Sequence, residues 1–158
     1  MSRIQKAFEN KKAFIAFLTA GDPSLDKTEE YILEMERAGA DLIEIGIPFS
    51  DPTAEGPVIQ AANVRALSGG VTTDKIFEMV EKIRKRTAIP MVFMTYANVV
   101  FSYGTERFVK KAADIGMDGL ILPDVPFEEK EEFDSVCRAH GLDLISLIAP
   151  TSHERIAR

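Results

Sequence analysis

Short apolar segments alternate with amphipathic helical patterns along most of the chain. Segments of this length, bounded by turn residues, are typical of buried strands. The pattern predicts strands over 13–20, 41–47, 89–96, 119–123 and 142–149. Apolar residues at helical spacing predict helices over 24–38, from 57 to about 69, and over 73–86, 105–115 and 128–139, with a further helix beginning at Thr151. Pro57 suits a first helical position, and Thr73 is the predicted cap of its helix.

A three-residue repeat supports this register. Gly39, Gly116 and Gly141 are each followed two residues later by an aspartate, between a helical pattern and the next apolar segment. Strands that are apolar on both faces need helices to cover them, and alternating strands and helices give a parallel sheet with right-handed crossovers. The sequence therefore predicts an α/β fold: a parallel β/α (TIM) barrel, incomplete, with five of eight β/α units in a single domain over 1–158.

The composition and charge of the chain limit the kinds of molecule that it is expected to bind. A net charge of -6 argues against nucleic-acid or anionic-membrane surfaces, which need clustered Lys and Arg. The single cysteine, Cys137, excludes an internal disulfide, and the first twelve residues lack the apolar core of a signal peptide. No apolar run approaches the ~20 residues of a membrane span. These features predict a soluble, cytoplasmic protein that binds small molecules or other proteins.

Glu44 is the first candidate for chemistry because it interrupts the apolar segment LIEIG. The period of a strand places Leu42 and Gly46 on its face. Burial raises the pKa of a carboxyl group toward the range of a general acid at neutral pH. The alternative is a solvated or salt-bridged glutamate at the rim of the sheet.

The segment PFSDPTAEG follows this strand, where a barrel collects its active-site loops, and contains Pro48, Asp51 and Glu55. Turn formation and helix capping are the alternative roles of the two carboxylates. The prolines make the segment stiff, which suits a positioned site as well as a rigid surface turn.

Further candidates lie near the carboxyl ends of other strands. Phe17, Met94 and Tyr96 belong to the first and third strands, and Asp124 directly follows the fourth. All four could face the same end of the barrel. Core packing is the alternative for Phe17 and Met94, and a cap on the acidic helix that follows is the alternative for Asp124.

Two other kinds of site are not expected. Neither His140 nor His153 has a Cys or His partner at ligand spacing, so the sequence predicts no metal site. The chain also lacks a phosphate-binding glycine loop of the dinucleotide or Walker type.

Four segments together resemble the alpha chain of tryptophan synthase: FLTAGDPS, ADLIEIGIPFSDPTAEGPVIQAAN, MTYANVVFSYG and GLILPDVPFEE. They follow the order of that family and cover nearly the whole chain. The resemblance implies a β/α eight-barrel lyase. Its members cleave indole-3-glycerol phosphate, by a retro-aldol reaction, into indole and glyceraldehyde 3-phosphate. No cofactor is expected in the alpha chain.

The resemblance also implies roles for the candidate residues. Glu44 corresponds to the general acid–base that protonates the indole carbon at the scissile bond. Glu55 takes the place of the second carboxylate, which accepts a hydrogen bond from the indole N–H and stabilises the developing positive charge. The positions that line or support the indole pocket correspond to Phe17, Met94 and Tyr96.

The implied partner is the tryptophan synthase beta chain, a pyridoxal-phosphate enzyme that receives the indole. Pro48 and Asp51 correspond to the loop that faces this partner. Asp124 corresponds to a loop residue involved in communication with it.

Two departures from the family pattern affect these expectations. The family's second carboxylate is normally an aspartate, whereas Glu55 is one methylene longer, and small displacements of a catalytic group can lower rates about 100-fold. The chain is also shorter than the ~250 residues of a full barrel, in which loops after strands seven and eight often bind phosphate. The sequence thus carries the acid–base half of the site without the phosphate-binding half.

An open five-stranded sheet leaves the first and fifth strands as edges with unpaired N–H and C=O groups, which favours self-association. Two functional interpretations stay open. The chain is part of a tryptophan synthase alpha lyase, or it is a catalytically inactive fragment that acts as a folding or assembly module. Another phosphosugar barrel enzyme is a weaker third possibility because of the PFSDP loop.

Overall fold

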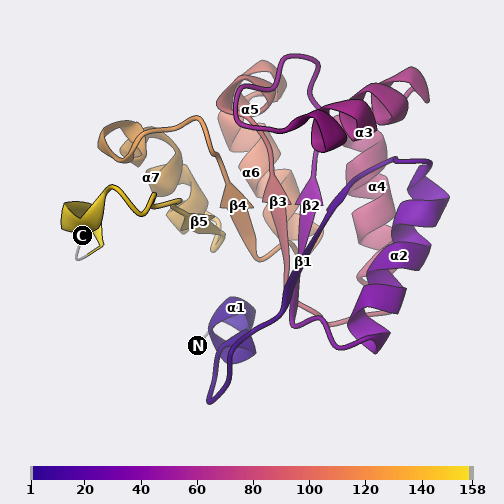
Figure 1. Cartoon of the computed structure of the whole chain (residues 1–158), viewed down its shortest axis with the longest axis horizontal. Coiled ribbons are helices and arrows are strands. Elements are labelled where there is room, and N and C mark those ends of the chain that lie inside the picture. Colours follow the sequence, from indigo (N-terminus) through magenta and orange to yellow (C-terminus); the bar gives the residue numbers. More distant parts are fainter. Residues whose placement is uncertain (1, 157–158) are drawn as a thin grey trace.

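The computed structural model describes residues 2–156 and contains a five-stranded sheet (Figure 1). Neighbouring strands are all parallel and follow each other in chain order. Each strand lies within its predicted segment, so the five predicted strands are confirmed. The strands are β1 (Ile15–Thr19), β2 (Leu42–Gly46), β3 (Met91–Met94), β4 (Gly119–Ile121) and β5 (Asp143–Ile145).

Helices connect the strands, and Figure 1 shows α2, α4 and α6 beside the sheet, with α3 and α5 near the carboxyl ends of β2 and β3. Pro57 occupies the start of α3, as predicted. The α-helices are α1 (Arg3–Ala7), α2 (Leu25–Arg37), α3 (Pro57–Ser68), α4 (Thr73–Ile83), α5 (Ala97–Tyr103), α6 (Thr105–Asp114) and α7 (Glu131–Ala139). Two 3-10 turns are η1 (Phe127–Glu129) and η2 (His153–Arg155).

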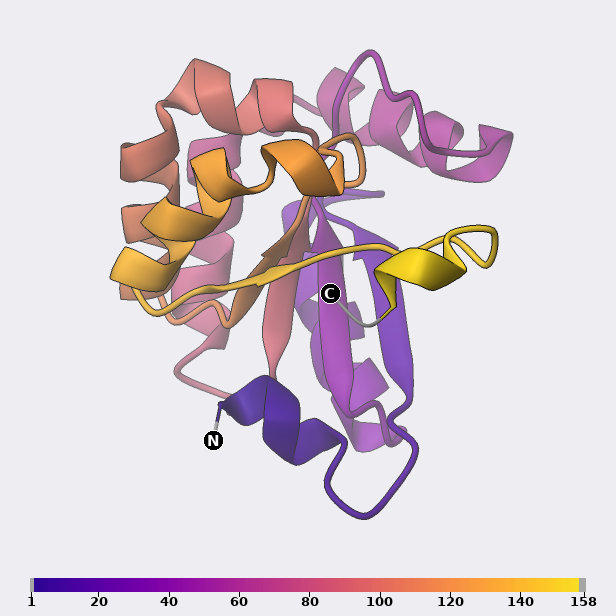
Figure 2. The same ribbon diagram turned by 90° about the vertical axis from the view of Figure 1, so that its left-hand side faces the viewer.

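The two faces of the sheet have different cover. Side chains of the outer face pack with α2, α4, α6 and α7 into the main hydrophobic core. The inner face holds a smaller buried cluster of Leu42, Val92 and Ile121, against which Ile4 of α1 packs. Figure 2 looks onto this face, with α1 below it and the chain after β5 crossing in front. The helix-covered face of the sheet therefore corresponds to the outside of a barrel wall, and the other face to the barrel interior.

The sheet is open over the described residues, because β1 and β5 each have one neighbouring strand there. Five parallel strands in sequential order, alternating with helices on the outside, form five units of a β/α barrel. The predicted fold class, an incomplete parallel β/α barrel, is confirmed.

The glycine repeat has a structural cause. Gly39, Gly116 and Gly141 have φ values of 103°, 88° and 71°, and each follows the end of a helix. After Gly116, Met117 N donates to Ala112 O at 3.0 Å, and the other two glycines are followed by the same backbone bond. This is the Schellman ending, which suits glycine because it has no Cβ. The aspartate then begins the pairing with the preceding strand: two residues after Gly116, Asp118 N donates to Met91 O at 2.8 Å.

Two helices are absent from the sequence prediction. The five residues of α1 and the seven of α5 are too short for a clear apolar periodicity. Ser2 starts α1 with a capping box formed with Gln5. The start of α5 directly follows Tyr96, at the end of the predicted third strand.

Three predicted helix boundaries are wrong. Thr72, and not Thr73, caps α4, because its hydroxyl accepts a hydrogen bond from Lys75 N at 3.3 Å. The helix predicted from residue 128 begins at Glu131, after η1. The helix predicted from Thr151 is only the 3-10 turn η2 within the described residues.

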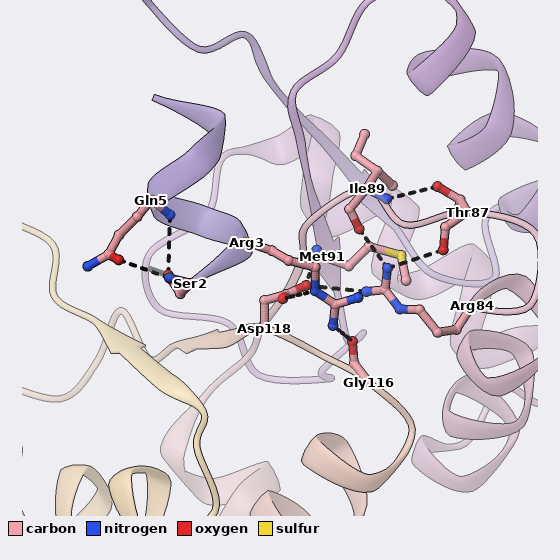
Figure 3. A network of polar contacts seen from close by, with 9 residues as sticks. All are labelled: Ser2, Arg3, Gln5, Arg84, Thr87, Ile89, Met91, Gly116 and Asp118. Carbon is pink, nitrogen blue, oxygen red and sulfur yellow. Dashed lines mark hydrogen bonds and ion pairs between the residues drawn. The ribbon is translucent and has the colours of Figure 1, made fainter. Parts of the chain in front are cut away.

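A partly buried ionic cluster joins Arg3 of α1 and Arg84, at the end of α4, to Asp118 just before β4 (Figure 3). Arg3 Nε donates to Asp118 Oδ1 at 2.6 Å, and Arg84 Nη2 lies 3.3 Å from Asp118 Oδ2. The same carboxylate accepts from Met91 N at 2.9 Å. The Asp118 and Arg84 side chains are only 7% and 14% exposed, whereas Arg3 is 39% exposed, so the Asp118–Arg84 pair is the more buried of the two. The cluster lies at the end of the sheet opposite the carboxyl ends of the strands, which is the end of a β/α barrel that contributes to stability.

Candidate active site

Glu44 lies at the middle of β2, paired with Phe17 of β1 and Val92 of β3. Strand alternation places it on the inner face with Leu42 and Gly46, as predicted. The side chain is half-buried, and burial raises its pKa above the ordinary value. Within residues 2–156 the structure gives its carboxyl group no hydrogen bond or ion pair, so the salt-bridged alternative is not found. A carboxyl group of this kind can hold a proton nearer neutral pH than a solvated one.

Phe17 and Met94 line the inner face next to this carboxyl group. The Phe17 ring lies over Gly46, where an added Cβ would come within 2.8 Å of Phe17 Cζ. Met94 packs at the border of the inner-face cluster. Both side chains are half-buried.

Tyr96 anchors the loop that follows β2. Its Oη accepts a hydrogen bond from Ala54 N at 3.0 Å, and its ring lies 5.4 Å from that of Phe49. The side chain is 3% exposed, and burial raises its pKa. These contacts hold the segment 49–54 above the carboxyl end of β3.

Glu55 ends this loop and is held from α3. Its Oε2 accepts from Asn63 Nδ2 at 2.7 Å, and its backbone O accepts from Gln60 Nε2 at 2.9 Å. The sequence interpretation missed both partners. Asn63 could have been noticed as a polar residue on the face that α3 buries with Ala62 and Ala66.

The three residues expected to face a partner occupy different surroundings. Pro48 is buried, whereas Asp51 is exposed and accepts a hydrogen bond from the Ser50 hydroxyl. Both oxygens of Asp124 accept from Ala97 N, at 3.1 and 3.2 Å. Asp124 therefore caps α5; the alternative role weighed for it, a cap on the helix that follows it, is wrong.

A cavity of about 630 Å³ lies beside the site, between residues 123–130 and the chain after β5. Asp124 lines it, while Glu44 and Glu55 do not. Arg155, on one wall, pairs with Glu128 at 3.0 Å. The cavity is thus a neighbour of the candidate site and contains neither of its two principal carboxylates.

Other reactive groups of the described chain offer little chemistry. No group of three or more His, Cys, Asp or Glu residues in the part that the structure describes could hold a metal ion. Burial raises the pKa of the Cys137 thiol to about 12, which keeps it protonated and unreactive at neutral pH. Among the described helices, none is long and apolar enough to cross a membrane.

Comparison with known proteins places the chain in a family. The model described as tryptophan synthase alpha chain matches residues 4–158. The tryptophan synthase alpha chain of Lacticaseibacillus casei is 46% identical over 158 residues, which cover 100% of this chain and 59% of that protein. The one from Alkaliphilus metalliredigens is 52% identical over 147 residues, or 93% of this chain and 55% of the relative. The chain thus spans little more than half the length of these relatives.

Solved structures agree with this placement. The crystal structure of tryptophan synthase subunit alpha from Legionella pneumophila has a TM-score of 0.92 and 41% identity, over 96% of this chain and 60% of that one. The tryptophan synthase complex from Pyrococcus furiosus gives a TM-score of 0.84 at 37% identity, over 87% of this chain and 57% of the other. By sequence and by fold, the chain belongs to the tryptophan synthase alpha chain family.

Proposed function

We propose that this chain carries the acid–base half of a lyase site that cleaves indole-3-glycerol phosphate into indole and glyceraldehyde 3-phosphate. One observation carries the proposal: Glu44 presents a half-buried carboxyl group on the inner face of the sheet, with no partner among residues 2–156 and with its pKa raised by burial. Membership of the family supports the same reaction class, carbon–carbon bond cleavage.

In the proposed reaction the Glu44 carboxyl group donates its proton to the indole ring carbon at the scissile bond. The ring becomes cationic, and the Glu55 carboxylate stabilises it by accepting a hydrogen bond from the ring N–H. The Glu44 carboxylate then takes the proton from the adjacent side-chain hydroxyl. The carbon–carbon bond breaks, its electron pair returns to the indole ring, and the aldehyde is released. No external oxidant, reductant or proton is needed.

The decisive measurement is indole release from indole-3-glycerol phosphate by the purified chain, comparing the wild type with Glu44→Gln. Glutamine keeps the size of the side chain and removes its proton transfer, so the rate should fall by about 100-fold or more. Glu81→Gln, at an exposed position on α4, is the matched control and should keep the wild-type rate.

A second function, that of a non-catalytic folding or assembly module, is favoured by the unpaired edges of β1 and β5. In barrels of this type the phosphate often binds in loops after strands seven and eight, whereas the structure describes five strands in residues 2–156. A folded wild-type chain with no indole release above background would support this second function.

The proposed partner is the beta chain, and the loop with Pro48 and Asp51 is the proposed contact, with Asp124 beside it. The relative from Pyrococcus furiosus was solved as a tryptophan synthase complex, which supports such an assembly. In this proposal the pyridoxal phosphate belongs to the beta chain, and the chain acts in the cytoplasm without a cofactor of its own. Isothermal titration with a purified beta chain tests it: Asp51→Lys should weaken binding, and Glu81→Lys should not.

A further inference from the structure

Asn63 is a buried side chain aimed at the second carboxylate. It lies on α3 and is only 4% exposed, and its Nδ2 donates to Glu55 Oε2 at 2.7 Å. A buried amide needs partners for its polar atoms, so this short bond is a strong constraint on both side chains. Asn63 lies eight positions after Glu55, so the bond joins the end of the loop to the second turn of α3.

The backbone around Glu55 is fixed independently. Gln60 Nε2 donates to Glu55 O at 2.9 Å, and Ala54 N donates to Tyr96 Oη at 3.0 Å. The loop end is thus held both from α3 and from the residue that follows β3. Only the Glu55 side chain is left to be oriented, and Asn63 supplies that contact.

The type of donor matters for the chemistry. An Arg or Lys at this place would neutralise the carboxylate, whereas a neutral amide orients it and leaves its charge in place. Within residues 2–156, Glu55 Oε1 has no hydrogen-bond partner in the structure, so one oxygen is occupied and the other is available. The extra methylene of glutamate adds a rotatable bond that an unheld side chain would use.

We propose that Asn63 is a positioning residue that holds Oε2 of Glu55 and so presents Oε1 to the ring N–H of the substrate. The role rests on the lyase function proposed above, because it acts on the carboxylate of that reaction. The same hydrogen bond accounts for a glutamate in place of the shorter aspartate, because it fixes the position of the Glu55 carboxylate despite the additional methylene.

The contact is tested without catalysis by the side-chain amide resonances of the ¹⁵N-labelled chain. Glu55→Gln removes the charged acceptor and keeps its length, so the Asn63 side-chain signal should shift. The Asn98 signal, from an exposed position on α5, is the internal reference and should stay in place. An Asn63 signal that does not respond to Glu55→Gln overturns the proposal whatever the activity.

A methylene exchange provides a sharper test. Glu55→Asp shortens one partner and should release the Asn63 amide, while adding Asn63→Gln returns the lost methylene from the other side. In the double variant the side-chain amide at position 63 should again show the signal of an amide hydrogen-bonded to a carboxylate, which Glu55→Asp alone abolishes. A double variant that behaves like Glu55→Asp would count against a direct contact.

The catalytic consequence is measured with indole-3-glycerol phosphate. Asn63→Leu keeps the volume and removes the donor, so kcat should fall about 10- to 100-fold with little change in KM. A folded Asn63→Leu chain with wild-type kcat refutes the positioning role alone. If the Asn63 signal responds to Glu55→Gln but the wild-type chain releases no indole, the contact is confirmed and the lyase function is refuted.

Discussion

At the scale of single residues, the charge of Glu44 opposes folding at neutral pH. Burial raises its pKa above the ordinary value of 4.5. The folded chain then holds this proton more tightly than the unfolded chain does. The resulting stabilisation is fully present below about pH 4.5 and is lost as the pH rises through the folded-state pKa.

Glu44→Gln, which stays neutral, should therefore have a larger free energy of unfolding than the wild type at pH 7, because the wild type must ionise a half-buried carboxyl group whose pKa burial has raised. The two should converge near pH 4. Urea unfolding of both proteins between pH 4 and pH 8 measures this, with Glu81→Gln as the control for loss of a carboxylate. A Glu44→Gln chain less stable than the wild type at pH 7 would show that a partner stabilises the ionised form.

The sequence predicted the face of Glu44 because a strand's period is fixed and its neighbours Leu42 and Gly46 are apolar. It could not predict that Asp124 caps α5, because that contact joins loops after two different strands. The Asn63–Glu55 bond depends on how a loop returns onto a helix, which periodicity does not encode.

At the scale of elements, the three helix endings at Gly39, Gly116 and Gly141 share a backbone conformation but differ in surroundings. A Cβ on Gly116 would lie 3.2 Å from Arg84 Cγ, whereas a Cβ on Gly141 would meet nothing within 4 Å. Arg84 cannot move freely, because it donates to Ile89 O at 2.7 Å and contacts Asp118.

Gly141→Ala should destabilise by about 1–2 kcal/mol, the effect of a side chain at positive φ alone. Gly116→Ala should destabilise by more, because it also displaces Arg84. The midpoints of urea unfolding compare the two variants. Equal losses would mean that the Arg84 side chain adjusts without disturbing its ionic cluster.

Longer elements were predictable and short ones were not. Helices α2 and α4 have caps and an apolar face over three turns, so their existence followed from sequence. The short α1 and α5 depend on tertiary contacts, such as that of Ile4 with the inner-face cluster and that of Asp124 with Ala97 N. Such contacts join residues that are far apart in the sequence.

At the scale of the whole molecule, alternation of strands and helices was enough to predict the parallel sheet and its order. The same topology leaves apolar surface at its margins. Ile15, on the inner face of the edge strand β1, is 38% exposed, and the neighbouring Phe14 is 61% exposed. Leu147, after the opposite edge strand β5, is 60% exposed.

Unpaired edges with apolar neighbours favour pairing with another chain. The 17.5 kDa chain should therefore form dimers or larger assemblies at micromolar concentration, with a mass that rises with concentration. Size-exclusion chromatography with light scattering measures that mass. Ile15→Lys places a charge on the inner face of the edge strand and should shift the protein toward the monomer. Val64→Lys, at a 63% exposed valine on α3, is the matched control and should leave assembly unchanged. A wild-type chain that stays monomeric over this range, or an equal response of both variants, would contradict association through the β1 edge.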